Sequence, residues 1–316
     1  MSEVKQKQHW SKLEERGSVI GMKILFSIYR LLGRKVLWIF LFPVVLYLHA
    51  TGSSARQASV TFLSTVNRVR GSNKTASYLD SLKHFCRFAD SAFDKIDAWL
   101  GRIKLTDIDY NNSNLFLSLL EKKQGAVFIG SHLGNLEVCR ALSQGRYATT
   151  LNVLVFTQNA VKFNQILESV NPSVSLNLIQ VNDIGPGLAM TLKDKVDQGE
   201  IVVIVGDRTS ITTGGRVVYA PFLGEEAPFS QGPFILASLL DCPVYWLFCL
   251  KHKGRFKVIF EHVADKLVLP RKERAKALQN VVEQYASRLS YYASQYPYQW
   301  FNFFDFWHKD DRVSRK

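Results

Sequence analysis

The sequence predicts an α/β protein with a mostly parallel mixed sheet flanked by helices, preceded by an N-terminal hydrophobic membrane-anchoring helix. Two observations predict the sheet: short runs rich in Val, Ile and Leu alternate with helical runs after about residue 125, and no internal repeat interrupts them. A third, a long apolar stretch near the N-terminus, predicts the anchor. With 316 residues, 47% of them hydrophobic, the chain can bury one large core.

The anchor is expected at residues 36–48, thirteen residues without a charge that follow Arg30, Arg34 and Lys35. A helix of this length reaches about 20 Å, less than the roughly 30 Å hydrocarbon core of a bilayer. The stretch therefore predicts a tilted, re-entrant or in-plane anchor as readily as an upright span. Two alternatives are a buried core helix and a signal peptide cleaved near residues 50–55, although a signal peptide normally begins its apolar region earlier.

Positive charge is concentrated in the leading segment. The whole chain carries +13, and residues 1–74 hold twelve Lys/Arg against three Glu. Such a segment suits an anionic partner, whether membrane headgroups, nucleic acid or an acidic carrier protein. Its apolar anchor and the lack of a nucleic-acid-binding motif favour membrane lipids and no nucleic acid. We therefore divide the chain into residues 1–55, a basic segment with the anchoring helix, and residues 56–316, one α/β domain.

The elements of that domain follow from hydrophobic periodicity. Residues 77–100 place apolar side chains three and four apart, which predicts an amphipathic helix that ends at Gly101. Strands are expected at residues 126–129, 151–156, 176–181, 201–205, 244–250 and 256–260, and helices from about residue 136, from residue 160, at 188–197, near 232–240 and at 267–294. Strands separated by helices indicate parallel pairing, and the Lys253-Gly254 turn joins the last two strands as a hairpin.

The four cysteines, Cys86, Cys139, Cys242 and Cys249, lie far apart without a C-x-x-C pair or a regular spacing to histidine. This pattern indicates neither a zinc site nor a disulfide framework. We interpret them as reduced core residues in a cytosolic environment and expect no metal site.

A candidate catalytic pair lies where an apolar strand ends in a Gly/Ser loop and a helix begins. His132 and Glu137 are five residues apart, so the carboxylate can orient the imidazole across the first helical turn and favour its protonated form. This is the base half of a catalytic triad, with the nucleophile supplied by the substrate. Gly134 allows close backbone approach, and helix-start N–H groups can stabilise an oxyanion. The spacing also arises by chance, and a helix-capping arrangement is the alternative.

Two further segments are candidates for substrate binding. Asp207 and Arg208 follow the strand expected at residues 201–205, and Arg binds phosphate or carboxylate through paired hydrogen bonds. A local surface ion pair between these two residues is the alternative. Pro221 and Phe222 belong to turn-rich aromatic loops that either shape an apolar channel or simply connect elements.

Taken together, these motifs resemble the late, lauroyl/myristoyl-type acyltransferases of lipid A assembly, within the lysophospholipid acyltransferase group. The likeness extends from the anchor to about residue 260. It rests on the hydrophobic N-terminal helix, G-x-H-x-G-N-x-E at residues 130–137, Gly206-Asp207-Arg208, and the loops with Pro221-Phe222 and Gly232-Pro233.

The resemblance implies a glycerolipid acyltransferase-like domain at residues 56–316. Its members transfer a fatty acyl group from a thioester, usually on acyl carrier protein, to a glycolipid hydroxyl at the cytoplasmic face of the bacterial inner membrane. His132 would be the general base and Glu137 its orienting partner. The co-substrate would be acyl carrier protein or coenzyme A carrying the acyl group, with no metal or redox cofactor. The substrate-binding residues would be Gly134, Asn135, Asp207, Arg208, Pro221 and Phe222.

The C-terminus departs from the family pattern. Lipid A enzymes commonly end in a Trp-x-His-Arg-Arg-like segment, whereas residues 299–308 read QWFNFFDFWH and lack the basic dipeptide. This ending favours another acceptor, as in a polyene-lipid or other pathway-specific branch. Its aromatic residues either line an acyl channel or pack on the core. The alternative function is a non-catalytic, membrane-tethered lipid-binding protein, and the lack of a G-x-S-x-G motif disfavours a hydrolase.

Overall fold

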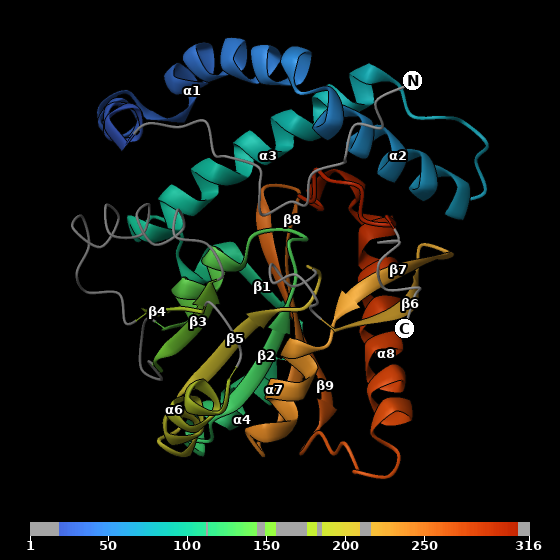
Figure 1. Cartoon of the computed structure of the whole chain (residues 1–316). Helices are drawn as coiled ribbons and strands as arrows, with labels where there is room; N and C mark the ends of the chain where they lie inside the picture. Colours follow the sequence, from blue (N-terminus) through green and yellow to red (C-terminus); the bar gives the residue numbers. More distant parts are fainter. Residues whose placement is uncertain are drawn as a thin grey trace.

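A seven-stranded mixed sheet forms the centre of the structure (Figure 1), a computed structural model that describes residues 19–111, 113–143, 149–155, 176–181, 185–208 and 216–308. From one edge to the other the strands are β1 (Ile108–Asn111), β9 (Arg255–Ala264), β8 (Val244–His252), β2 (Ala126–Gly130), β5 (Ile201–Val205), β3 (Leu151–Val155) and β4 (Leu176–Gln180). Neighbouring strands are parallel except for the β8–β9 hairpin. The predicted mostly parallel mixed sheet is confirmed.

Alternate residues of the central strands face two different cores, because side chains point to opposite faces of a strand. In β2, Val127 and Ile129 join one core while Ala126 and Phe128 join the other. The first core contains α2 (Ser53–Val69), α6 (Pro186–Asp197), α7 (Gly232–Leu239) and α8 (Arg274–Gln295). The second contains α4 (Ser113–Glu121), the 3₁₀ helix η3 (Leu136–Ser143) and the end of α3 (Tyr78–Trp99). Helices therefore cover both faces of the sheet, as predicted.

Several details differ from the sequence-based expectation. Helix α8 begins at Arg274 instead of residue 267, since Pro270 cannot donate a helical hydrogen bond. The pair β1 and α4 was not predicted, because their apolar patterns are short. Pro221 and Phe222 end the strand β6 (Val217–Phe222), which pairs with β7 (Glu225–Ser230) in a separate hairpin. The helix expected from residue 160 lies outside the described residues.

Three helices lie above the sheet: α1 (Val19–Thr51), α2 and α3, with α3 between α1 and the sheet (Figure 1). A capping box of Ser77 and Asp80 starts α3. By length and composition, Leu31–Thr51 of α1 is a candidate membrane span, and only two of its residues, Leu37 and Val45, are buried. This exposure argues against the buried-core-helix alternative. Helix α1 is interrupted at Gly33, where φ is 77°.

Two short 3₁₀ helices complete the described chain. One, η2 (Leu105–Asp107), precedes β1, and the other, η4 (Pro297–Gln299), follows α8. The segment after η4 returns the chain to the carboxyl end of the central strands, where an isolated bridge pairs Trp300 with Leu133. The C-terminal aromatic residues thereby meet the loop that follows β2.

Candidate functional site

The pairing of β2 with β5 places His132 beside Asp207. These parallel strands are in register, with Gly130 opposite Val205, and each candidate lies two residues beyond that pair. A hydrogen bond from Gly206 N to Gly130 O, 2.9 Å long, extends the pairing past the strand ends. Both side chains therefore emerge at the carboxyl edge of the sheet, where ligands gather in open α/β folds.

Asp207 is the carboxylate that holds His132. Its Oδ1 lies 2.7 Å from the imidazole Nδ1, and its Oδ2 accepts the backbone N–H of His132 at 2.8 Å. The carboxylate is fully buried, whereas 26% of the His132 side chain is exposed. With Nδ1 donating to the carboxylate, the lone pair of Nε2 is available to accept a proton.

Two residues from the C-terminal segment complete the environment of the carboxylate. The indole N–H of Trp300 donates to Oδ2 of Asp207 at 3.0 Å, and Nδ2 of Asn302 donates to the same oxygen at 3.3 Å. Both side chains are buried, at 0% and 1% exposure. Sequence reasoning did not assign either of them to the site. The carboxylate is therefore fixed from three directions, which in turn fixes the imidazole ring.

The charges of this pair suit a base at neutral pH. Burial, followed by the positive charge of Arg208, holds the pKa of His132 below its ordinary value, although Asp207 acts in the opposite direction. Burial acts to raise the pKa of Asp207, but its interactions with His132 and the charge of Arg208 outweigh burial and lower it. An imidazole that is neutral beside an ionised carboxylate can accept a proton.

The structure does not bring Glu137 to the imidazole. Its carboxylate lies 3.1 Å from Nζ of Lys95 on α3, and its backbone N–H donates to Oδ1 of Asn135 at 3.1 Å. Glu137 is the second residue of the 3₁₀ helix η3, and its side chain projects toward α3 and not back toward His132. Asp207 occupies the position that the sequence led us to expect for Glu137.

Gly134 and Asn135 pack the loop that follows β2 against the rest of the domain. The N–H groups of Gly134 and Asn135 donate to Gln299 O at 2.7 Å and Cys249 O at 2.8 Å. Gly134 has a φ of 81°, and a Cβ added there would lie 1.8 Å from Cys249 O. Both N–H groups are therefore already used. The oxyanion donors that we expected are the N–H groups at the helix start, and two of these, of Glu137 and Val138, donate to Oδ1 and O of Asn135 at 3.1 and 3.2 Å. Gly134 is needed because the loop backbone passes so close to β8 that there is no room for a Cβ.

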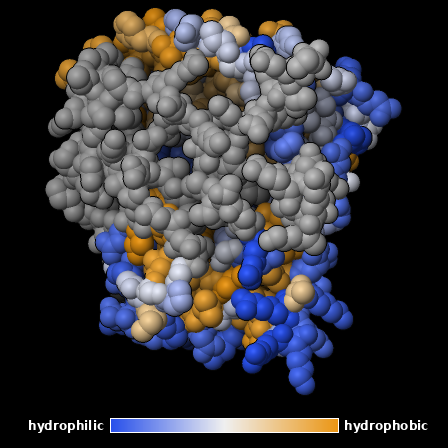
Figure 2. Space-filling view, in the orientation of Figure 1, coloured by the Kyte–Doolittle hydropathy of each residue, from blue (hydrophilic) through white to orange (hydrophobic). Residues whose placement is uncertain are grey.

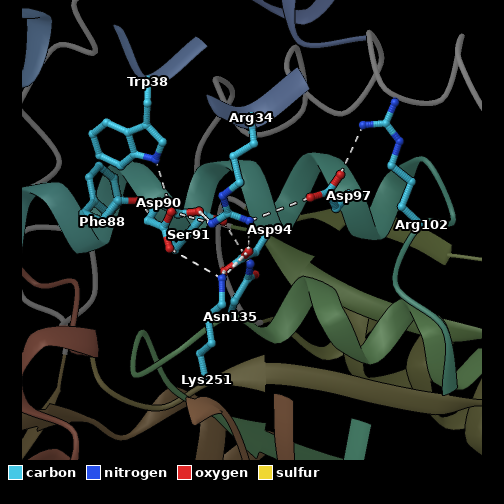
Figure 3. Close-up of polar contacts among 10 residues, drawn as sticks. All are labelled: Arg34, Trp38, Phe88, Asp90, Ser91, Asp94, Asp97, Arg102, Asn135 and Lys251. Carbon is cyan, nitrogen blue, oxygen red and sulfur yellow. Dashed lines mark hydrogen bonds and ion pairs between the residues drawn. The ribbon is translucent and has the colours of Figure 1, made fainter. Parts of the chain in front are cut away.

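A network of partly buried charged side chains around the buried Asp94 ties this loop to the helices above it (Figure 3). Asn135 Nδ2 donates to the carbonyl of Ser91 on α3 at 3.1 Å. One turn further along, Asp94 lies 2.7 Å from both Lys251 Nζ of β8 and Arg34 Nη1 of α1. Burial raises the pKa of Asp94 despite these two cations. Helix α1, helix α3, strand β8 and the loop after β2 are therefore joined by one set of polar contacts.

The other predicted site residues have different surroundings. Arg208 Nε donates to Oδ1 of Asn302 at 3.3 Å, and its side chain is partly exposed. Phe222 is fully buried, stacked on Trp307 and packed against Trp300, so it belongs to the core. Pro221 is exposed on the other face of β6. Of the predicted residues Asp207, Arg208, Pro221 and Phe222, only Asp207 and Arg208 lie next to His132.

The loop also borders a basic pocket of about 580 Å³ on its β8 side, away from Asp207 on the β5 side. Asn135 and Phe301 form part of its wall, and Lys83, Arg87 and Lys253 contribute positive charge. The loop therefore has the His132–Asp207 pair on one side and a basic pocket on the other.

The fold and this pair define an α/β protein equipped for proton transfer at the carboxyl edge of a parallel sheet. The family model described as bacterial lipid A biosynthesis acyltransferase matches residues 91–308. The chain belongs to this family, and so is an acyltransferase that acts on lipid A-like substrates. The match includes His132 and Asp207 and excludes α1 and α2. No curated protein matches the chain.

Proposed function

We propose that this protein transfers a fatty acyl group from an acyl thioester to a hydroxyl of a lipid or glycolipid acceptor, with His132 as general base and Asp207 as its orienting carboxylate. The 2.7 Å contact between Nδ1 of His132 and the buried Asp207 carries the proposal. The donor we propose is acyl carrier protein, and the location is the cytoplasmic face of the bacterial inner membrane. Family membership supports the acyl transfer and the lipid A-like acceptor.

The steps of the proposed reaction balance without a further reactant. Nε2 of His132 takes the proton of the acceptor hydroxyl while the oxygen attacks the thioester carbonyl. The tetrahedral intermediate then releases the thiolate, which takes the proton back from the imidazolium. Asp207 stabilises the positive charge that the ring carries between these two events. The products are a lipid ester and a free thiol, so the reaction needs no metal or redox group.

Arg208 would then serve in two ways. Its positive charge lowers the pKa of His132 and so favours the neutral base. Its partly exposed guanidinium, held by Asn302, is also suited to bind a phosphate of the acceptor or donor. The choice between lipid A and a polyene or other lipid as acceptor depends on which chemical groups of the acceptor contact Arg208 and the aromatic C-terminal segment.

An acyl-transfer assay with the purified full-length protein tests the proposal. The protein is incubated in mixed micelles with acyl carrier protein or coenzyme A carrying a fatty acyl group, and with a lipid A precursor that has free hydroxyls. We expect the mass of the acceptor to rise by one acyl chain and a free thiol to appear. Binding of the precursor without a change in its mass, with either donor and with a panel of alternative lipid hydroxyls, would support the non-catalytic binder instead.

The hydrogen bond from Trp300 to Asp207 predicts a change in pH dependence. Replacing Trp300 with Phe removes the N–H donor, so Asp207 attracts a proton on His132 more strongly and the pKa of His132 rises. Since the neutral imidazole is the active form, the acid limb of the kcat/KM profile should move to higher pH by roughly one pH unit. Initial rates between pH 5 and 8 measure it.

A matched substitution in the same aromatic cluster provides the control. Trp307 donates its indole N–H to the carbonyl of Phe222, not to the carboxylate. Trp307→Phe should therefore leave the acid limb where it is, even if it lowers the melting temperature. If the acid limb moved equally in both variants, or did not move in Trp300→Phe, the indole of Trp300 would have no influence on the pKa of His132.

A further inference from the structure

Helix α1 contacts α3 at both ends of the stretch from Tyr29 to His49. Near the start, the ring of Tyr29 stacks on Phe93, with centroids 5.5 Å apart. Near the end, His49 Nε2 lies 3.3 Å from Ser81 Oγ, and its ring contacts Phe85 at 5.1 Å. The two helices therefore run antiparallel and side by side over about twenty residues of α1.

The middle of this contact is held by charge (Figure 3). Arg34 reaches from α1 to the carboxylates of Asp90 and Asp94, and the indole of Trp38 donates to Asp90 at 3.4 Å. The Asp94 side chain is 5% exposed. Moving α1 away would leave the buried carboxylate of Asp94 with only one of its two cations, so separation of the helices is disfavoured.

This attachment is incompatible with an upright membrane span. A spanning helix needs about twenty apolar residues along the bilayer normal, with lipid or other apolar helices around it. Here the neighbour is α3, which presents Asp90, Asp94 and Asp97 toward α1 and carries exposed Lys83 and Arg87. If α1 crossed the bilayer in this arrangement, α3 would have to enter the hydrocarbon beside it.

The face of α1 that points away from α3 is apolar and exposed. Figure 2 shows hydrophobic residues gathered at the edge of the molecule where α1 lies. Nine large side chains contribute, each between 40% and 81% exposed: Leu31, Leu32, Ile39, Phe40, Phe42, Val44, Leu46, Tyr47 and Leu48. An apolar surface of this extent on one helix marks a place where another apolar phase binds.

We propose that α1 lies in the plane of the membrane, with this exposed face in one leaflet that contains anionic lipids and with α3 on the aqueous side. The charge of the surrounding chain selects the partner. Residues 19–74, which include α1 and α2, contain eight Lys/Arg and no Asp or Glu. Anionic headgroups complement that charge. A second copy of this chain would bring the same positive charge to the contact.

The arrangement sets the position of the site relative to the lipid. Asn135 ties the loop that carries His132 to α3, and α3 is bound along its length to α1. The membrane-bound helix therefore fixes the height of the site above the leaflet. The inference concerns membrane contact alone and does not rest on the proposed acyl transfer.

Depth measurements with nitroxide labels distinguish a helix that lies in the membrane plane from a helix that crosses the bilayer. Single cysteines replace Ile39, Leu46 and Ala50, which are all exposed and share one stripe because they are seven and eleven residues apart. The full-length protein carries Cys86→Ser, since the other three cysteines are buried. Labelled protein is bound to vesicles of phosphatidylethanolamine and phosphatidylglycerol, and collisions with oxygen and an aqueous nickel complex report the depth. Lys272→Cys, on an exposed loop, gives the aqueous baseline.

We expect the three labels on α1 to be immersed in lipid at the same depth, within about 3 Å, near the headgroup–acyl boundary. A spanning helix would separate the labels at residues 39 and 50 by about 16 Å along the normal and would overturn the proposal. Labels accessible to neither reagent, with spin–spin broadening that unlabelled protein dilutes away, would assign the face to a second copy. Labels that are inaccessible to both reagents without such broadening would mean that residues 1–18 cover the face. Either result also overturns the proposal.

Discussion

Replacing Asp207 with Asn is expected to lower kcat/KM for acyl transfer by about 10³- to 10⁴-fold while the protein stays folded. The amide has nearly the shape of the carboxylate, but it cannot stabilise an imidazolium. It can also present an N–H to Nδ1 of His132, which would move the ring proton to Nε2, the nitrogen that must accept the substrate proton. Initial rates with saturating acyl donor, and melting temperatures of both proteins, measure the two parts of this prediction.

Glu137→Gln is the matched control, because it makes the same chemical change at the carboxylate that the sequence pairs with His132. Glu137 and Lys95 are 20% and 28% exposed, so their ion pair is partly screened and stabilises the protein only modestly. We expect kcat/KM to fall by no more than about tenfold. His132→Ala gives the lower limit of activity. If Glu137→Gln approached that limit while Asp207→Asn did not, the orienting role would return to Glu137.

The local patterns of the sequence predict the sheet and its helices well. Apolar runs such as residues 126–129 and 201–205 are bounded by polar or glycine residues, and each is a buried strand in the structure. The Lys253-Gly254 turn correctly predicts the β8–β9 hairpin. Short elements such as β1 were missed because four residues carry too little periodicity to stand out.

The partnership of His132 with Asp207 depends on strand order, which local patterns do not contain. Both residues were recognised as candidates because each follows an apolar strand, but 75 positions separate them. They meet only because β2 lies next to β5 in parallel register, and another strand order would have kept them apart. Glu137 looked like the partner because it is near in sequence, yet the 3₁₀ helix turns its side chain toward α3.

The C-terminal aromatic segment illustrates a second limit. Its composition predicted either an acyl channel or packing on the core, and the structure places Trp300 and Phe306 in the core. Composition did not reveal that the polar atoms of Trp300 and Asn302 would be aimed at Asp207. Buried indole and amide groups need hydrogen-bond partners, so a Trp-x-Asn pair in an apolar segment is a signal that a buried acceptor lies nearby.

The loop that presents His132 makes a strong prediction about stability. Gly134→Ala is expected to destabilise the protein by about 2–5 kcal/mol, since it combines a left-handed backbone for Ala with overpacking. Gly134 has a φ of 81°, and the added Cβ would be 1.8 Å from the carbonyl oxygen of Cys249 in the buried strand β8. A backbone carbonyl in the middle of a sheet cannot move aside as a flexible side chain can. The melting temperature in detergent, by calorimetry or fluorescence, measures the effect.

Gly254→Ala separates the two contributions. Gly254 has nearly the same φ, 83°, in the β8–β9 turn, but a Cβ there would meet nothing within 4 Å. Its substitution should cost only the backbone term, about 1–2 kcal/mol. The difference between the variants is therefore the cost of pushing the His132 loop away from β8. Equal losses of stability would mean that the loop can shift without strain, and Gly134 would then no longer explain how the loop holds the imidazole at Asp207.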